Sequence, residues 1–80
     1  MGKMERIISI LKEIQPIGEF EADTMLFESG YVDSLVIFER LLPRLEEIYG
    51  IQIEPMELIP DNFETPEAIG KYVERKMQKL

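Results

Sequence analysis

Apolar residues recur at intervals of three and four positions in three segments of this chain, a spacing that places them on one face of an α-helix. The strongest pattern runs from Leu35 to Tyr49 and stops at Gly50, a residue suited to the end of a helix. Three such segments predict an all-α bundle in which the apolar faces share one core. The apolar positions are Met4, Ile7, Ile8, Leu11 and Ile14 in the first segment, Leu35, Phe38, Leu41, Leu42, Leu45, Ile48 and Tyr49 in the second, and Ile69, Tyr72, Val73, Met77 and Leu80 in the third.

Turn-forming and capping residues mark the ends of the first and third segments. Pro16 and Gly18 follow the first segment and stop it. Thr65 is suited to accept a backbone hydrogen bond as the N-cap of the third helix. Pro66 fits the first helical position, where its missing N–H group costs nothing.

Two connections link the three main helices. Residues 15–32 show no clear period and predict a long loop that is functional or packed by its own side chains. Residues 51–64 begin with a short extended piece, and Pro55 to Ile59 fit one short helical turn. The expected architecture is three main helices and one short helix in a single domain over residues 1–80. The loop residues expected to pack onto the core are Ile17, Phe20, Met25, Leu26 and Phe27.

Composition excludes several classes of function. The chain has 80 residues, of which 45% are hydrophobic, which is enough for one compact core. It contains no cysteine and no histidine, so the usual nucleophile, general base and zinc ligands are missing. A net charge of −7 disfavours binding to nucleic acid or to an anionic membrane and favours protein partners with basic patches. No stretch is long and apolar enough to span or insert into a membrane, and the chain is expected to be cytoplasmic.

The sequence "GYVDSL", residues 30–35, places an aspartate and a serine directly before the strongest helix. Either Asp33 or Ser34 is suited to be the N-cap, which would stabilise the helix by about 1 kcal/mol. A cap requires only one of the two. A catalytic serine needs a base, and without histidine the neighbouring Asp33 is a weak one. The remaining interpretation of Ser34 is a hydroxyl presented to another enzyme.

The same residues resemble the modification site of acyl carrier proteins and peptidyl carrier domains. The resemblance continues through "LEEIYGIQI" at the end of the second helix and "NFETPEAIGKYVERK" near the C-terminus, and so covers nearly the whole chain. It implies an acyl-carrier-like four-helix bundle without catalytic residues of its own and without a metal. It also implies that Ser34 receives phosphopantetheine covalently from coenzyme A, with Asp33 in a supporting role. The thiol of that group would carry an acyl or aminoacyl group as a thioester.

The details of the motif are similar to stand-alone D-alanyl and aminoacyl carriers. Two residues separate Gly30 from Asp33, and Val36 stands where fatty-acid carriers usually have an acid. The resemblance implies three partners in a specialised pathway: a phosphopantetheinyl transferase, an adenylating acyl or aminoacyl ligase, and a downstream acyltransferase or synthase. It also implies that the ligase largely chooses the cargo and that the carrier is a monomer.

Pro43 lies inside the second segment and distinguishes this chain from the pattern it resembles. Its ring crowds the carbonyl group of Glu39, so we expect one helix that is kinked near residues 39–43. Most members of the resembled family also have one residue fewer between Ser34 and Gly50. The extra residue is expected to be absorbed as a bulge at the proline, which would re-aim the second half of the helix.

The second helix is also where the resemblance places partner binding. The residues assigned to that role are Leu35, Val36, Ile37, Glu39, Arg40, Glu46 and Glu47. Solvation alone also explains scattered glutamates, and Val36 and Ile37 fit packing under the long loop equally well. The alternative function is a small acidic helical adaptor that binds a basic protein surface, with Ser34 serving only as a helix cap.

Overall fold

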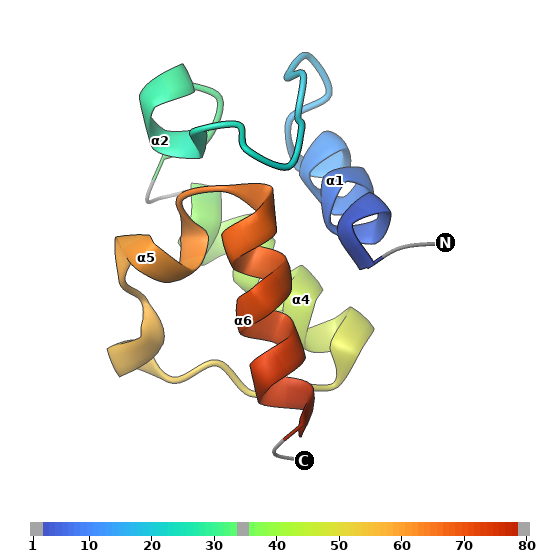
Figure 1. Ribbon diagram of the computed structural model, residues 1–80, viewed down its shortest axis with the longest axis vertical. Coiled ribbons are helices and arrows are strands. Elements are labelled where there is room, and N and C mark those ends of the chain that lie inside the picture. Colours follow the sequence, from blue (N-terminus) through green and yellow to red (C-terminus); the bar gives the residue numbers. More distant parts are fainter. Residues whose placement is uncertain (1–2, 34–35, 79–80) are drawn as a thin grey trace.

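The computed structural model describes residues 3–33 and 36–78, and these residues form helices joined by loops, without a strand among them (Figure 1). The first long helix is α1 (Lys3–Ile14) and the last is α6 (Pro66–Gln78). The second long helix covers residues 36–49 and lies behind α6 in Figure 1. The all-α prediction, with three long helices of the acyl carrier type, is confirmed.

The second long helix changes its winding just before the proline. Val36 is α-helical, η1 (Ile37–Leu41) is a π-helical turn, and α4 (Leu42–Tyr49) returns to the α-helix. At the junction the Leu42 N–H donates to the carbonyl of Ile37, the bonding pattern of a π-turn. A regular α-helix would press the ring of Pro43 against the carbonyl four residues earlier. The expected interruption of the helix is therefore present, as a π-turn.

The helix ends follow the local chemistry of the sequence. Gly50 ends α4 in the left-handed conformation, with φ of 66°, and its N–H donates to the Glu46 carbonyl at 2.9 Å. Thr65 Oγ1 accepts from the Ala68 N–H at 3.0 Å, so Thr65 is the N-cap of α6 as predicted. Both boundaries could be predicted because glycine adopts a positive φ easily and threonine supplies a side-chain acceptor.

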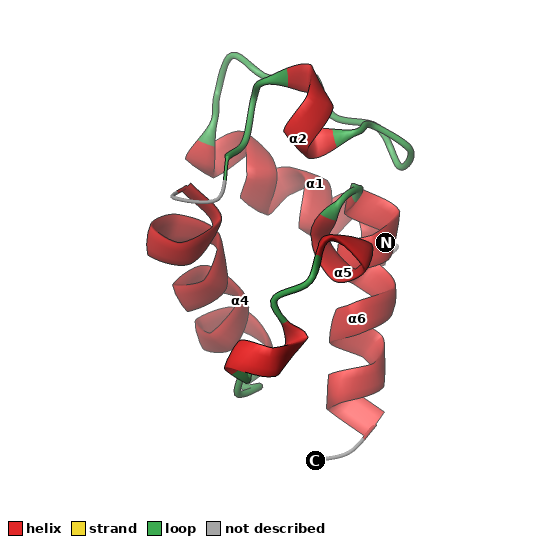
Figure 2. Ribbon diagram, turned by 90° about the vertical axis from the view of Figure 1, so that its left-hand side faces the viewer, coloured by secondary structure: helices red, strands yellow, loops and turns green. Residues whose placement is uncertain are grey.

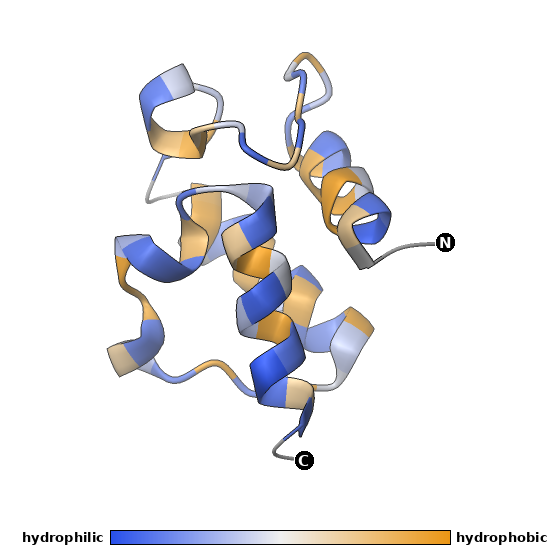
Figure 3. Ribbon diagram, in the orientation of Figure 1, coloured by the Kyte–Doolittle hydropathy of each residue, from blue (hydrophilic) through white to orange (hydrophobic). Residues whose placement is uncertain are grey.

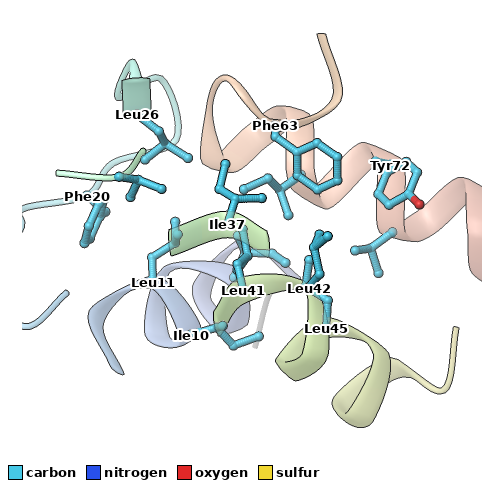
Figure 4. Close-up of a cluster of buried hydrophobic side chains, with 14 of the residues drawn as sticks. Ile10, Leu11, Phe20, Leu26, Ile37, Leu41, Leu42, Leu45, Phe63 and Tyr72 are labelled. Carbon is cyan, nitrogen blue, oxygen red and sulfur yellow. The ribbon is translucent and has the colours of Figure 1, made fainter. Parts of the chain in front are cut away.

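The core is formed where the three long helices meet, and α6 contacts both of the others (Figure 4). Within this core Phe63 and Tyr72 pack against each other, with ring centroids 5.3 Å apart. The buried apolar residues are Ile7, Ile10, Leu11, Phe20, Leu26, Val32, Ile37, Leu41, Leu42, Leu45, Ile51, Phe63, Ile69, Tyr72 and Val73.

The long loop between α1 and the second long helix contains a helical turn that the sequence did not predict. This turn is α2 (Leu26–Ser29), and Gly30 ends it with φ of 82°. Two backbone hydrogen bonds tie the loop to the start of α6: Leu26 N–H donates to Glu64 O at 2.8 Å, and Glu67 N–H donates to Ala22 O at 3.0 Å. The periodicity signal is weak because one helical turn is too short to show it.

Only part of the loop packs as expected. Phe20 and Leu26 are buried, whereas Ile17, Met25 and Phe27 are exposed, so the packing prediction was wrong for these three. The same applies to Met77 of α6, which is 39% exposed. An apolar residue type does not by itself indicate burial, because many apolar side chains remain on protein surfaces.

The connection from α4 to α6 contains two short helical pieces where one was expected. They are η2 (Pro55–Glu57), a 3₁₀ turn, and α5 (Pro60–Phe63). The Glu57 carboxylate joins this connection to α6: its Oε1 accepts from Tyr72 Oη at 2.9 Å and from Lys76 Nζ at 3.0 Å. Burial raises the pKa of Glu57, but these donors and the Glu54 N–H outweigh it and leave the pKa below its ordinary value.

Candidate functional site

Asp33 starts the second long helix. Its Oδ1 accepts from the Val36 N–H at 2.9 Å, and its backbone carbonyl accepts from the Ile37 N–H at 3.1 Å. The first bond joins a side chain to the backbone N–H three residues later, as an N-cap side chain does, and the second is a main-chain bond of the helical type to the carbonyl four residues earlier. Of the two residues that the sequence offered as caps, Asp33 makes the capping bond. Ser34 and Leu35 lie outside the described residues.

The chain segment leading to Asp33 is fixed from several sides. Gln15 Nε2, just after α1, donates to the Tyr31 carbonyl at 3.1 Å. The Tyr31 ring meets Phe20 edge to face, with centroids 5.6 Å apart. Val32 is buried. The approach to the candidate site is therefore held against the core immediately before the exposed Asp33.

Gln15 and Phe20 were not singled out from the sequence as site-forming residues. Gln15 follows a predicted helix and its carbonyl partner belongs to the main chain, which carries no signal in the residue type. Phe20 was expected only to pack onto the core. The close approach of Gly18 to the Phe20 ring, where an added Cβ would lie 2.5 Å from a ring atom, is likewise visible only in three dimensions.

Val36 and Ile37 follow the cap and were assigned either to packing or to the surface. Ile37 is 4% exposed and belongs to the core, so its side chain packs and is not presented to a partner. Val36 is half-buried against the same core. Packing is the better description for Ile37 because the π-turn carries it, together with Leu41, to the inner face.

The four charged residues assigned to partner binding differ in their surroundings. Glu39 and Arg40 are exposed on η1. Glu46 is half-buried, and its Oε2 accepts from the Ile53 N–H at 2.9 Å, so it holds the connection that follows α4. Glu47 accepts from Arg44 Nη1 at 2.6 Å. Glu46 and Glu47 thus make bonds within the protein itself.

Arg44 joins the second long helix to α1. Its guanidinium group donates to both carboxylate oxygens of Glu13, at 2.9 Å and 3.2 Å. The hydrogen bonds and charge of Glu13 raise the pKa of Arg44 above its ordinary value. The charges on this face of the helix are therefore partly neutralised by their neighbours.

A phosphodiester fits the start of the second long helix. The cap bond to Val36 and the main-chain bond to Asp33 define a helix N-terminus at an exposed position. The helix dipole there favours a negatively charged phosphate group. The described residues include no carboxylate cluster suited to a metal ion, and none of their helices is long and apolar enough to cross a membrane.

Residues 5–73 match the family described as phosphopantetheine attachment site. The chain is 30% identical over 78 residues to the D-alanyl carrier protein of Abiotrophia defectiva, a match that covers 95% of this chain and 98% of that protein. It is 42% identical over 78 residues to the lincomycin biosynthesis protein LmbN of Streptomyces lincolnensis, covering 94% of this chain. The chain spans only 28% of LmbN. No solved structure gives a significant match.

The family match explains the chemistry that the side chains do not provide. Members carry an acyl or aminoacyl group on a covalently attached phosphopantetheine, so a chain without cysteine works through a thiol that it receives from outside. The helical architecture and the exposed, capped helix start are consistent with this role. The chain belongs to the phosphopantetheine attachment-site family of carrier proteins.

Proposed function

We propose that the Ser34 hydroxyl is the attachment point for phosphopantetheine and that the chain carries an acyl or aminoacyl group without being an enzyme itself. The observation that carries this proposal is the bond from the Val36 N–H to Asp33 Oδ1. Since Asp33 supplies the cap, the adjacent serine is not needed for that purpose. Its hydroxyl follows a cap residue that is itself exposed.

The attachment reaction needs an external enzyme because this chain contains no histidine and no cysteine. In the proposed step Ser34 Oγ forms a bond to the phosphorus that bears the pantetheine unit of coenzyme A. The pyrophosphate bond breaks, adenosine 3′,5′-bisphosphate leaves, and the hydroxyl proton passes to the transferase or to water. The attached group supplies a thiol on which cargo is held as a thioester. Asp33 fixes the helix start beside the reacting hydroxyl.

The two relatives favour a specialised carrier over a housekeeping one. One is named a D-alanyl carrier protein and the other a lincomycin biosynthesis protein. We therefore propose, in addition to the transferase, an adenylating ligase that loads an acyl or aminoacyl group and a downstream acyltransferase or synthase. We also propose that the carrier works as a monomer in the cytoplasm, where coenzyme A and ATP are available.

The test is intact mass spectrometry of the chain after incubation with coenzyme A and a broad-specificity phosphopantetheinyl transferase. The parent is expected to gain one phosphopantetheinyl group. Ser34→Ala is expected to gain none, while Ser9→Ala, which alters an exposed serine on α1, should react like the parent. The proposal would be contradicted if Ser34→Ala were modified, or if the folded parent were not modified. The second result would favour the acidic adaptor.

A further inference from the structure

The long loop between α1 and the second long helix, residues 15–32, has an inner and an outer side. Phe20, Leu26 and Val32 point into the core and are at most 7% exposed. Ile17, Met25 and Phe27 are 81%, 43% and 38% exposed, although they come from the same short segment. We call Ile17, Met25 and Phe27, together with the acidic residues named below, the outer loop face.

The outer loop face belongs to a segment that is held in place. A hydrogen bond from the Gln15 side chain to the Tyr31 carbonyl joins the two ends of the loop, and Ala22 and Leu26 make backbone hydrogen bonds with the start of α6. Within the loop, Thr24 Oγ1 accepts from the Glu21 N–H at 2.7 Å. Its exposed apolar side chains are therefore presented on a fixed backbone, and such preorganisation lowers the entropy lost on binding.

The charge of this segment is of one sign. No lysine or arginine occurs between Lys12 and Arg40 in the sequence. The loop itself carries four acidic side chains, all of them exposed, at Glu19, Glu21, Asp23 and Glu28. Figure 3 shows hydrophilic and hydrophobic segments alternating along the loop and α2. Apolar and acidic groups on one fixed segment suit a partner that is basic around an apolar contact.

The second long helix carries exposed charges of both signs at Glu39 and Arg40, and its other charged side chains are bonded within the protein. Arg44 is bonded to Glu13 and Glu47, and Glu46 is bonded to the Ile53 N–H. Figure 2 shows that the loop and α2 occupy one end of the molecule, the end from which the chain enters the second long helix. The outer loop face therefore continues directly into the segment that contains Asp33.

We infer that the outer loop face is the docking surface for the phosphopantetheinyl transferase, an inference that rests on the proposed function. That enzyme binds coenzyme A, whose phosphate groups require cationic side chains beside the reacting hydroxyl. The exposed acidic side chains of the loop that leads into Asp33 would meet this basic rim, and the exposed apolar side chains would be covered on docking. In this arrangement the loop, more than the helix, sets the affinity for the transferase.

The test compares two triple variants in the same assay. Ile17→Ser/Glu19→Gln/Asp23→Asn alters the outer loop face. Met56→Ser/Glu5→Gln/Glu74→Gln removes the same number of charges and one exposed apolar side chain elsewhere, since Met56 is 85% exposed. Initial rates of attachment from coenzyme A are measured over a range of carrier concentrations, and circular dichroism shows that both variants are folded.

The loop variant is expected to raise KM for the carrier about tenfold with kcat within about twofold, and to weaken the dependence of KM on salt. The control variant is expected to match the parent within about twofold. Equal KM values for the two variants would overturn the inference. It would also be overturned if the helix variant Glu39→Gln/Glu47→Gln raised KM more than the loop variant does. In either case the parent still gains the group on Ser34, whereas failure of the proposed function would leave the parent itself unmodified.

Discussion

Replacing Asp33 with alanine should destabilise the protein by an amount that follows from one hydrogen bond. The side chain satisfies the Val36 N–H at 2.9 Å, which the helix itself leaves without an acceptor. Loss of an N-cap acceptor costs about 0.5–2 kcal/mol, typically about 1 kcal/mol. Asp33 is exposed, so water replaces part of the lost bond and the expected cost is about 1 kcal/mol. For a domain of this size, the melting temperature should fall by about 4–8 °C.

Asp33→Asn separates the cap from the charge. Asparagine is as good an N-cap as aspartate, so the bond to Val36 is retained. The lost charge removes a favourable interaction with the helix dipole of about 0.3–1 kcal/mol at low salt, and less at physiological ionic strength. We expect this variant to lie within about 0.5 kcal/mol of the parent. Urea unfolding followed by far-ultraviolet circular dichroism measures both variants against the parent.

Two results would refute this reasoning. If Asp33→Asn and Asp33→Ala were equally destabilised at physiological salt, the charge and not the acceptor would stabilise the helix start. If Asp33→Ala matched the parent, the Val36 bond would contribute no stability. Ser34 would then again be a candidate cap, and the main support for its role in attachment would be lost.

Three further predictions concern the rest of the fold. Tyr72→Phe should destabilise the protein by about 1–2 kcal/mol because it removes a hydrogen bond to the Glu57 carboxylate. Tyr49→Phe should be neutral or stabilising because that buried hydroxyl has no partner among the described residues, and parallel urea titrations of the two variants test both expectations. Glu57 has a lowered pKa in the folded state, so its contribution to stability is present above its ordinary pKa and is lost as the pH falls through its pKa in the folded state. Glu57→Gln should therefore flatten the acid side of a curve of stability against pH, and an unchanged acid side would contradict the assignment. Gly70→Ala should stabilise α6 by about 0.5–1 kcal/mol, since the added Cβ would lie 3.7 Å from Met4 Cε; a lower melting temperature would count against it.

The sequence predicted the elements whose ends are determined by their own residues. Gly50 and Thr65 close or open a helix through bonds that their residue types favour, and the structure contains both bonds. The loop from α1 was harder to predict because its anchors are main-chain groups such as Ala22 O and Glu67 N–H, which any residue offers. The helical turn α2 depends on those anchors, so periodicity gave no sign of it.

The candidate site was predictable as a motif but not as a geometry. Asp33 and Ser34 are both good caps, and only the position of Asp33 Oδ1 beside the Val36 N–H distinguishes between them. Ile37 was ambiguous for a related reason. Whether it faces inward depends on how the helix is wound, and its π-turn depends on both Pro43 and the tertiary packing.

The π-turn before Pro43 also determines how the second long helix can unwind. Fraying spreads along a helix by breaking successive main-chain bonds, and a proline donates none, so the ladder has a gap at Pro43. C-terminal to the gap, the Arg44 side chain donates hydrogen bonds to Glu13 of α1. Before the gap, Ile37 and Leu41 are buried in the core, so the two halves of the helix are held by different contacts. Unwinding that starts in one half of the helix therefore meets a missing main-chain hydrogen bond at Pro43 before it reaches the other half.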